Sequence, residues 1–204
     1  PGAITLRQTA NCYKIIETRL CCRISEVYNK MNMNLKQRKK PNMDCINLLT
    51  SILLCYPEIS EISVEPEHEE VYISYTVDRI LNDEDLSQTR EFLEDSILSY
   101  QYLENLVPEK NDIVLEVREK ATFINITRDV KTFSHGELRL LNEIVKDRFA
   151  KNLISEPDKV PLVDTGILSQ LELIDTMLGS LKINPVEEKM VGIRENGRVI
   201  VYNK

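Results

Sequence analysis

The order of apolar and polar residues divides the chain into segments with a helical period and segments with a strand period. Apolar side chains recur every three or four positions in segments that are predicted to be helical: residues 5–38, 43–55, 83–103, 134–153 and 167–181. Apolar and polar residues alternate in segments that are predicted to form β-hairpins: residues 62–78, 112–128 and 191–202. The pattern therefore predicts helices that alternate with hairpins along the chain.

An α+β fold with antiparallel hairpins follows from this order. The two strands of each hairpin are joined by a short polar turn rather than a long crossover, so a doubly wound parallel sheet is not expected. The C-terminal hairpin has the clearest turn, because Asn196-Gly197 is a dipeptide that a type I′ turn prefers. A two-residue turn there predicts that Ile193 pairs with Ile200.

Two stretches of the chain resemble each other. Residues 70–79 align with residues 121–130, which places Tyr72 on Phe123 and Asp78 on Asp129. With the preceding helices included, helix–hairpin units are predicted at three places: residues 43–78, 84–130 and 165–202. The first two units suggest an internal duplication, and the alternative is a chance likeness between amphipathic patterns.

Three regions are predicted from composition and from breaks in the periodicity. A basic amphipathic helix occupies residues 1–40, and an α+β core with two helix–hairpin units occupies residues 41–154. A linker and the last helix–hairpin unit occupy residues 155–204. Pro157 and Pro161 mark the linker, because proline lacks a backbone donor and interrupts periodic structure.

Capping residues define two of the predicted helix starts. Asn42 or Asp44 caps the helix at residues 43–55, and Ser134 forms a capping box with Glu137 three residues later. His135 follows directly in the first helical turn. We expect an exposed residue there, and a pH-sensitive or catalytic group is the alternative.

The N-terminal segment combines a long apolar stripe with an excess of positive charge. The stripe consists of Ile16, Leu20, Ile24, Val27, Met31 and Leu35. Residues 1–40 contain nine basic and two acidic residues, whereas the whole chain has a formal net charge of −7. We expect the stripe to mediate self-association, and packing on the chain's own core is the alternative.

Lys36, Arg38, Lys39 and Lys40 form the only dense basic run of the sequence. Such a run can contact nucleic-acid phosphates or a protein partner. It is also typical of a solvated helix C-terminus, because cations there interact favourably with the helix dipole. No aromatic residue lies within the run to stack on bases, so nucleic-acid binding is the alternative hypothesis.

The cysteines indicate a reducing compartment. All five lie within the first 55 residues, and none forms a CxxC pair: Cys12, Cys21, Cys22, Cys45 and Cys55. We expect them to be reduced, as in the cytoplasm. No apolar run approaches the length of about 18 residues that a membrane helix needs, so no membrane span is expected.

Motifs for catalysis or cofactor binding do not occur in the sequence. GxSxG, HExxH and P-loop patterns are absent, and His68 and His135 are the only histidines. The turn around His68 contains four glutamates: Glu65, Glu67, Glu69 and Glu70. Their spacing is not that of a calcium loop, so we expect no metal site.

The patterns favour a non-catalytic interaction or regulatory protein that acts as a homo-oligomer. Its expected partner is itself or another protein, no cofactor is expected, and no catalytic residue can be named. Two alternatives are a nucleic-acid binder that uses the basic N-terminal helix and an enzyme without a recognisable motif. The hydrophobic fraction of 42% and the charged fraction of 29% are typical of a folded globular protein.

Overall fold

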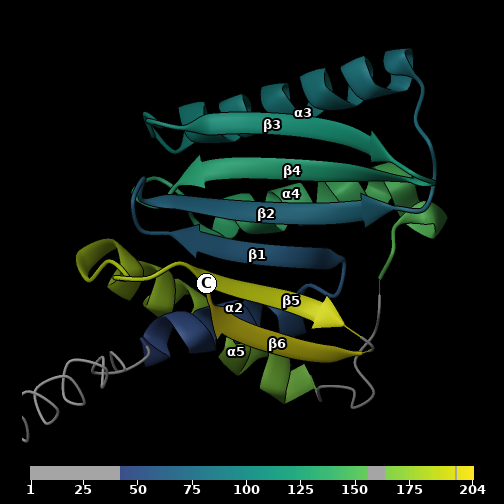
Figure 1. The fold of residues 1–204 in the computed structure, drawn as a ribbon. Helices are drawn as coiled ribbons and strands as arrows, with labels where there is room; N and C mark the ends of the chain where they lie inside the picture. Colours follow the sequence, from purple (N-terminus) through teal and green to yellow (C-terminus); the bar gives the residue numbers. More distant parts are fainter. Residues whose placement is uncertain (1–41, 156–163, 196) are drawn as a thin grey trace, which may run out of the picture. The chain divides into compact units, whose positions relative to one another are not determined.

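The computed structural model describes residues 42–155, 164–195 and 197–204, which belong to one compact unit spanning residues 42–204. Its elements are α2 (Met43–Cys55), β1 (Ile59–Glu65), β2 (Glu70–Val77), α3 (Asp83–Leu103), β3 (Asn111–Arg118), β4 (Ala121–Asp129), α4 (His135–Phe149), η1 (Ala150–Asn152), α5 (Asp164–Ile183), β5 (Met190–Glu195) and β6 (Arg198–Asn203) (Figure 1). The predicted α+β fold with antiparallel hairpins is confirmed.

The described strands form a six-stranded antiparallel sheet in the order β3-β4-β2-β1-β5-β6. The first two hairpins meet where β2 pairs with β4, and the last hairpin joins where β5 pairs with β1 (Figure 1). The predicted core and the predicted C-terminal unit therefore share one sheet. In the last hairpin Ile193 pairs with Ile200, as the two-residue turn predicts.

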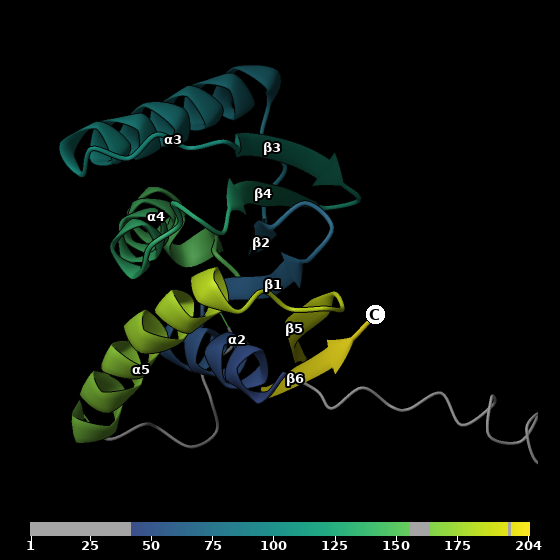
Figure 2. The ribbon, with the colours of Figure 1, turned by 90° about the vertical axis from the view of Figure 1, so that its left-hand side faces the viewer.

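The described helices lie on one face of the sheet and leave the other face open (Figure 2). Alternate residues of each strand point toward the helices, and those of β2 are all buried: Val71, Ile73, Tyr75 and Val77. Gly192 of β5 also faces α2, where an added Cβ would lie 3.0 Å from Leu53 Cδ1. The missing side chain therefore lets α2 pack close against the sheet.

Local signals define the starts of α2 and α4. Asn42 Oδ1 accepts a hydrogen bond from Cys45 N at 3.1 Å, and Ser134 Oγ accepts one from Glu137 N at 3.2 Å. The predicted capping box is only half formed, because the Glu137 carboxylate accepts hydrogen bonds from the buried Arg128 guanidinium. A buried charge partner thus replaces the local backbone partner that the box would use.

Several predicted features lie outside the described residues: the helix at residues 5–38, the basic run Lys36, Arg38, Lys39 and Lys40, and Cys12, Cys21 and Cys22. Within the described part of the chain, Cys45 and Cys55 are free thiols, and burial raises the pKa of Cys45 to about 12. None of the described helices is long and apolar enough to cross a membrane.

Candidate functional site

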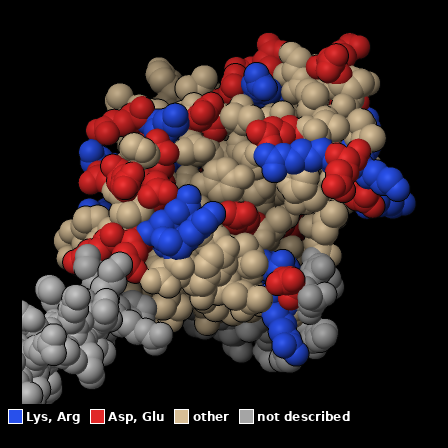
Figure 3. Space-filling model, in the orientation of Figure 1, with Lys and Arg blue, Asp and Glu red and all other residues tan. Residues whose placement is uncertain are grey.

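The open face of the sheet carries small polar side chains on its two central strands. Ser63 of β1 and Ser74 of β2 alternate with residues that face the core. A β-bulge between Ile59 and Glu61 places an extra residue, Ser60, beside Glu61 on this face. Uncharged residues occupy most of the middle of the face, and charged side chains gather mainly around them (Figure 3).

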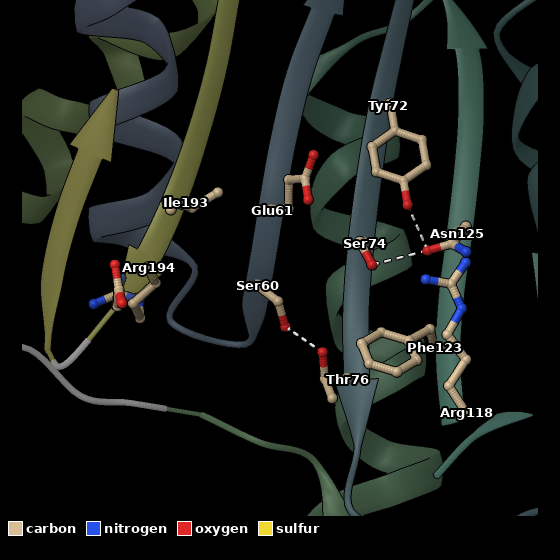
Figure 4. Close-up of a pocket in the computed structure, with 11 residues that line it drawn as sticks. Ser60, Glu61, Tyr72, Ser74, Thr76, Arg118, Phe123, Asn125, Ile193 and Arg194 are labelled. Carbon is tan, nitrogen blue, oxygen red and sulfur yellow. Dashed lines mark hydrogen bonds between the residues drawn. The ribbon is translucent and has the colours of Figure 1, made fainter. Parts of the chain in front are cut away.

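These small side chains lie in a polar trough that follows β1 and β2, and Figure 4 shows the part of it that Ser60, Ser74 and Thr76 line. The trough consists of two adjoining hollows of about 390 and 350 Å³, which share Glu61 and Tyr72 in their lining. Its other central residues are Ser60, Ser63, Ser74, Thr76, Phe123, Asn125, Thr127 and Ile193. Both hollows have the size of typical ligand sites.

Asn125 of β4 organises the hydrogen bonds of the polar trough. Its Oδ1 accepts hydrogen bonds from the Tyr72 hydroxyl at 2.7 Å and from the Ser74 hydroxyl at 2.9 Å (Figure 4). Burial raises the pKa of Tyr72, which keeps its phenol protonated and able to donate. Because Oδ1 already accepts two hydrogen bonds, the Asn125 Nδ2 group remains as the donor that a ligand can use.

Two outward-facing side chains of β1 lack a polar partner among the described residues. Glu61 is half-buried and lines both hollows, yet it forms no ion pair or hydrogen bond with a described residue. Ser63 is only 3% exposed and lines one hollow, and its Oγ forms no hydrogen bond within the described part of the chain. The residue is enclosed by its neighbours, but its hydroxyl still opens onto the hollow, so a ligand there can hydrogen-bond to Ser63.

A cation at each end of the polar trough forms an ion pair with a nearby glutamate. At one end Arg118 forms an ion pair with Glu116, and its guanidinium carbon lies 5.7 Å from the centre of the Phe123 ring. At the other end Lys189 Nζ lies 3.0 Å from a carboxylate oxygen of Glu65. These cations are therefore already engaged, and Glu61 is left as an uncompensated charge between them.

His135 is buried, so the expectation of an exposed residue is wrong. Its ring is 6% exposed, with Nε2 2.6 Å from the Tyr56 hydroxyl and Nδ1 3.2 Å from Asp175 Oδ2. A carboxylate only accepts hydrogen bonds, so Nδ1 carries a proton and donates to Asp175. The sequence could not show this, because Tyr56 follows α2 and Asp175 lies in α5. The three residues connect helices on the covered side of the sheet.

A second buried network surrounds Arg128 at the end of β4. The guanidinium is fully buried, and its five N–H groups donate to Glu137, Asp129, Thr132 and the carbonyl of Lys110. Burial opposes the ionisation of Asp129, but hydrogen bonds from Thr132 and Lys110 and the charge of Arg128 hold its pKa below the usual value. This network satisfies its own charges and stabilises the junction of β4 with α4.

The other predicted candidate residues are placed as follows. His68 is exposed in the turn between β1 and β2, and it lines one hollow of the polar trough together with Glu65 and Glu70. Within the described ranges, no group of three or more His, Cys, Asp or Glu side chains is arranged to hold a metal ion. The possible nucleic-acid or partner contacts, Lys36, Arg38, Lys39 and Lys40, lie outside those ranges.

The polar trough was not predicted from the sequence, although the strands contain a signal for it. Four small polar residues interrupt segments that are otherwise rich in Ile, Val and Tyr: Ser60, Ser63, Ser74 and Thr76. Small side chains on one face make a low floor wherever larger side chains stand beside them. Phe123 and Ile193 stand there only because β4 and β5 flank the central pair, and no local pattern predicts that strand order.

No protein-family model, curated protein or solved structure matches this chain. The two buried networks hold helices and strands together, whereas the polar trough directs hydrogen-bonding groups outward. The trough is therefore the candidate functional site.

Proposed function

We propose that this protein is a non-catalytic interaction protein that binds an extended segment of a partner protein in the polar trough. The observation that carries the proposal is a pair of outward-facing groups without a polar partner in the described part of the chain, Glu61 and Ser63, on a sheet face that the described helices leave uncovered. From Ser60 to Glu65 the trough measures about 17 Å, which is the length of about five extended residues.

A peptide backbone suits the hydrogen-bonding groups of the polar trough. Its carbonyl groups accept from Asn125 Nδ2 and from the Ser63 hydroxyl, while Tyr72 and Phe123 provide aromatic surface for its side chains. A nucleic acid suits the trough less well, because the charge of Glu61 repels phosphates. The favoured partner is therefore a protein segment.

Titration of the isotope-labelled full chain with short peptides tests this function by nuclear magnetic resonance. Separate pools of five-residue peptides carry a basic, acidic, apolar or uncharged polar residue at the centre. We expect at least one pool to shift the backbone amide signals of Ser63, Ser74 and Asn125 while the signal of Asn142 in α4 stays in place. Shifts confined to the helices, or no shift with any pool, would contradict the proposal.

Homo-oligomer formation is a second part of the proposal, and its support is the apolar stripe in the sequence of residues 5–40. Replacing Leu20 and Val27 together with Asp interrupts that stripe. We expect the double variant to sediment as a single folded chain, because charged residues oppose apolar association. Two outcomes would contradict self-association: the variant unfolds, or the parent protein is already a single chain at micromolar concentration. In either case the stripe packs on the chain's own core.

A further inference from the structure

We infer that the segment bound in the polar trough presents a lysine or arginine side chain to Glu61. The inference rests on the proposed function and specifies the chemistry of the partner. Its two supports are a carboxylate and a hydroxyl, Glu61 and Ser63, which have no polar partner among the described residues, lie on the same strand and face the same side of the sheet.

Glu61 is placed to hold a cation in the middle of the polar trough. It lines both hollows and is half-buried, and no described cation pairs with it. A partly buried carboxylate has lost part of its hydration, so a charge-assisted hydrogen bond from a ligand stabilises it more than an exposed carboxylate. The cations of the lining are engaged elsewhere: Lys189 pairs with Glu65, Arg118 pairs with Glu116, and Arg194 donates to the Leu53 carbonyl. This role is therefore left to the ligand.

Ser63 provides an independent second contact. It is the next outward-facing residue of β1 after Glu61, about 7 Å further along the strand. Its Oγ is directed into the trough and has no partner among the described residues, although the residue is only 3% exposed. The same distance of about 7 Å separates alternate residues of an extended peptide. A basic side chain at Glu61 therefore brings a backbone carbonyl of the same segment to Ser63.

Tyr72 keeps this part of the polar trough in shape. It pairs with Ser63 in the register of β1 and β2, and its hydroxyl is held by Asn125 at 2.7 Å. The ring is thus fixed beside the two contact residues before a ligand arrives. Because the wall is already ordered, binding loses less conformational entropy.

The test compares blocked peptides of the form Thr-Ser-X-Ser-Thr, in which X is Arg, Lys, Gln or Glu. Dissociation constants come from amide shifts of the full chain at near-physiological salt. We expect the Arg and Lys peptides to bind about tenfold more tightly than the Gln peptide, because a charge-assisted hydrogen bond is roughly twice as strong as a neutral one. The Glu peptide is expected to bind most weakly.

Matched protein variants separate the trough from general surface charge. Glu61→Gln is expected to remove the preference for Arg and Lys over Gln, whereas Ser63→Ala weakens binding of all the peptides. The control Glu91→Gln removes the same charge from an exposed position on α3, and it should leave every dissociation constant unchanged. Native amide spectra of the three variants establish that each is folded.

The possible outcomes distinguish the inference from the function on which it rests. If the Gln or Glu peptide binds in the trough as tightly as the Arg peptide, the partner needs no basic side chain and the inference is overturned. The proposed interaction function would still hold. Absence of trough shifts with every peptide would overturn the function itself. Equal weakening by Glu61→Gln and Glu91→Gln would show nonspecific charge attraction and overturn the inference. If spermidine at an equal concentration displaces the Arg peptide, the trough binds a small amine rather than a peptide segment, and the inference is overturned.

Discussion

On the covered side of the sheet Arg128 donates hydrogen bonds to Glu137, Asp129 and Thr132, whereas on the open face Glu61 and Ser63 have no such partner among the described residues. Both regions take polar groups partly or fully out of water. Only the Arg128 network replaces the lost hydration with hydrogen bonds to described residues. The difference separates polar groups that stabilise the fold from polar groups that remain available to a ligand.

Two buried tyrosines on the covered side differ in the same way. The Tyr56 hydroxyl is hydrogen-bonded to His135, but the Tyr75 hydroxyl is fully buried and has no partner among the described residues. Burial alone therefore does not identify a stabilising polar group. Substitutions on the covered side and substitutions on the open face should change different properties of the protein. Covered residues with partners should change stability, and residues of the polar trough should change binding.

Breaking the Arg128 network should have the largest effect. Arg128→Met leaves the carboxylate of Glu137 buried without its cation, which should lower the free energy of unfolding by about 3–5 kcal/mol. Urea denaturation measures this change. The control Arg118→Ala removes a basic residue from an exposed ion pair and should cost less than about 1 kcal/mol. Equal losses in the two variants would remove the contrast between the two regions.

The two buried tyrosines should respond in opposite directions to the same chemical change. Tyr56→Phe removes a hydrogen bond to His135 and should destabilise the protein by about 1 kcal/mol. Tyr75→Phe removes an unsatisfied hydroxyl and should stabilise it by about 1 kcal/mol. Thermal and urea unfolding of both variants provide the measurement. A loss of stability in Tyr75→Phe would show that its hydroxyl has a partner, such as a buried water molecule.

The low pKa of Asp129 predicts how stability changes in acid. A carboxyl whose pKa is lower in the folded state than in the unfolded state stabilises the fold above its unfolded pKa. That contribution is lost as the pH falls from about 4 through the folded pKa. Asp129→Asn should therefore flatten the decline of the urea midpoint over this range. An unchanged decline would mean that Asp129 has the same pKa in both states.

Substitutions in the polar trough should have the smallest effect on stability. Glu61→Gln and Ser63→Ala break no hydrogen bond with a described residue, so each should change the free energy of unfolding by less than about 0.5 kcal/mol. Urea denaturation of the variants used for peptide binding checks this directly. Losses as large as that of Tyr56→Phe would assign these residues to the fold.

Much of the fold could be predicted from local patterns. Alternation predicted the hairpins at residues 62–78 and 112–128, and Asn42 and Ser134 defined the starts of α2 and α4. These features depend on residues close together in the sequence, so a short window contains their cause.

The candidate site depended on contacts that no short window contains. Tyr72 is 53 residues from its hydrogen-bond acceptor Asn125, and Tyr56 is 79 residues from His135. Alternation shows which side of a strand a residue occupies but not which strand lies beside it. The trough residues also looked ordinary in the sequence, because serine and threonine are common on solvated strand faces. The trough that they form became visible only when the strand order placed larger side chains around them.

Contacts between a bound Arg peptide and the side chains of the protein test the central claim most directly. Intermolecular nuclear Overhauser effects should connect the peptide to the ring protons of Tyr72 and Phe123 and to the methyl groups of Ile193, which line the polar trough. They should not appear at Tyr102, an 83% exposed residue of α3 that serves as an accessible control away from the open face. Effects at Tyr102 without effects at Tyr72 would contradict the assignment of binding to the open face.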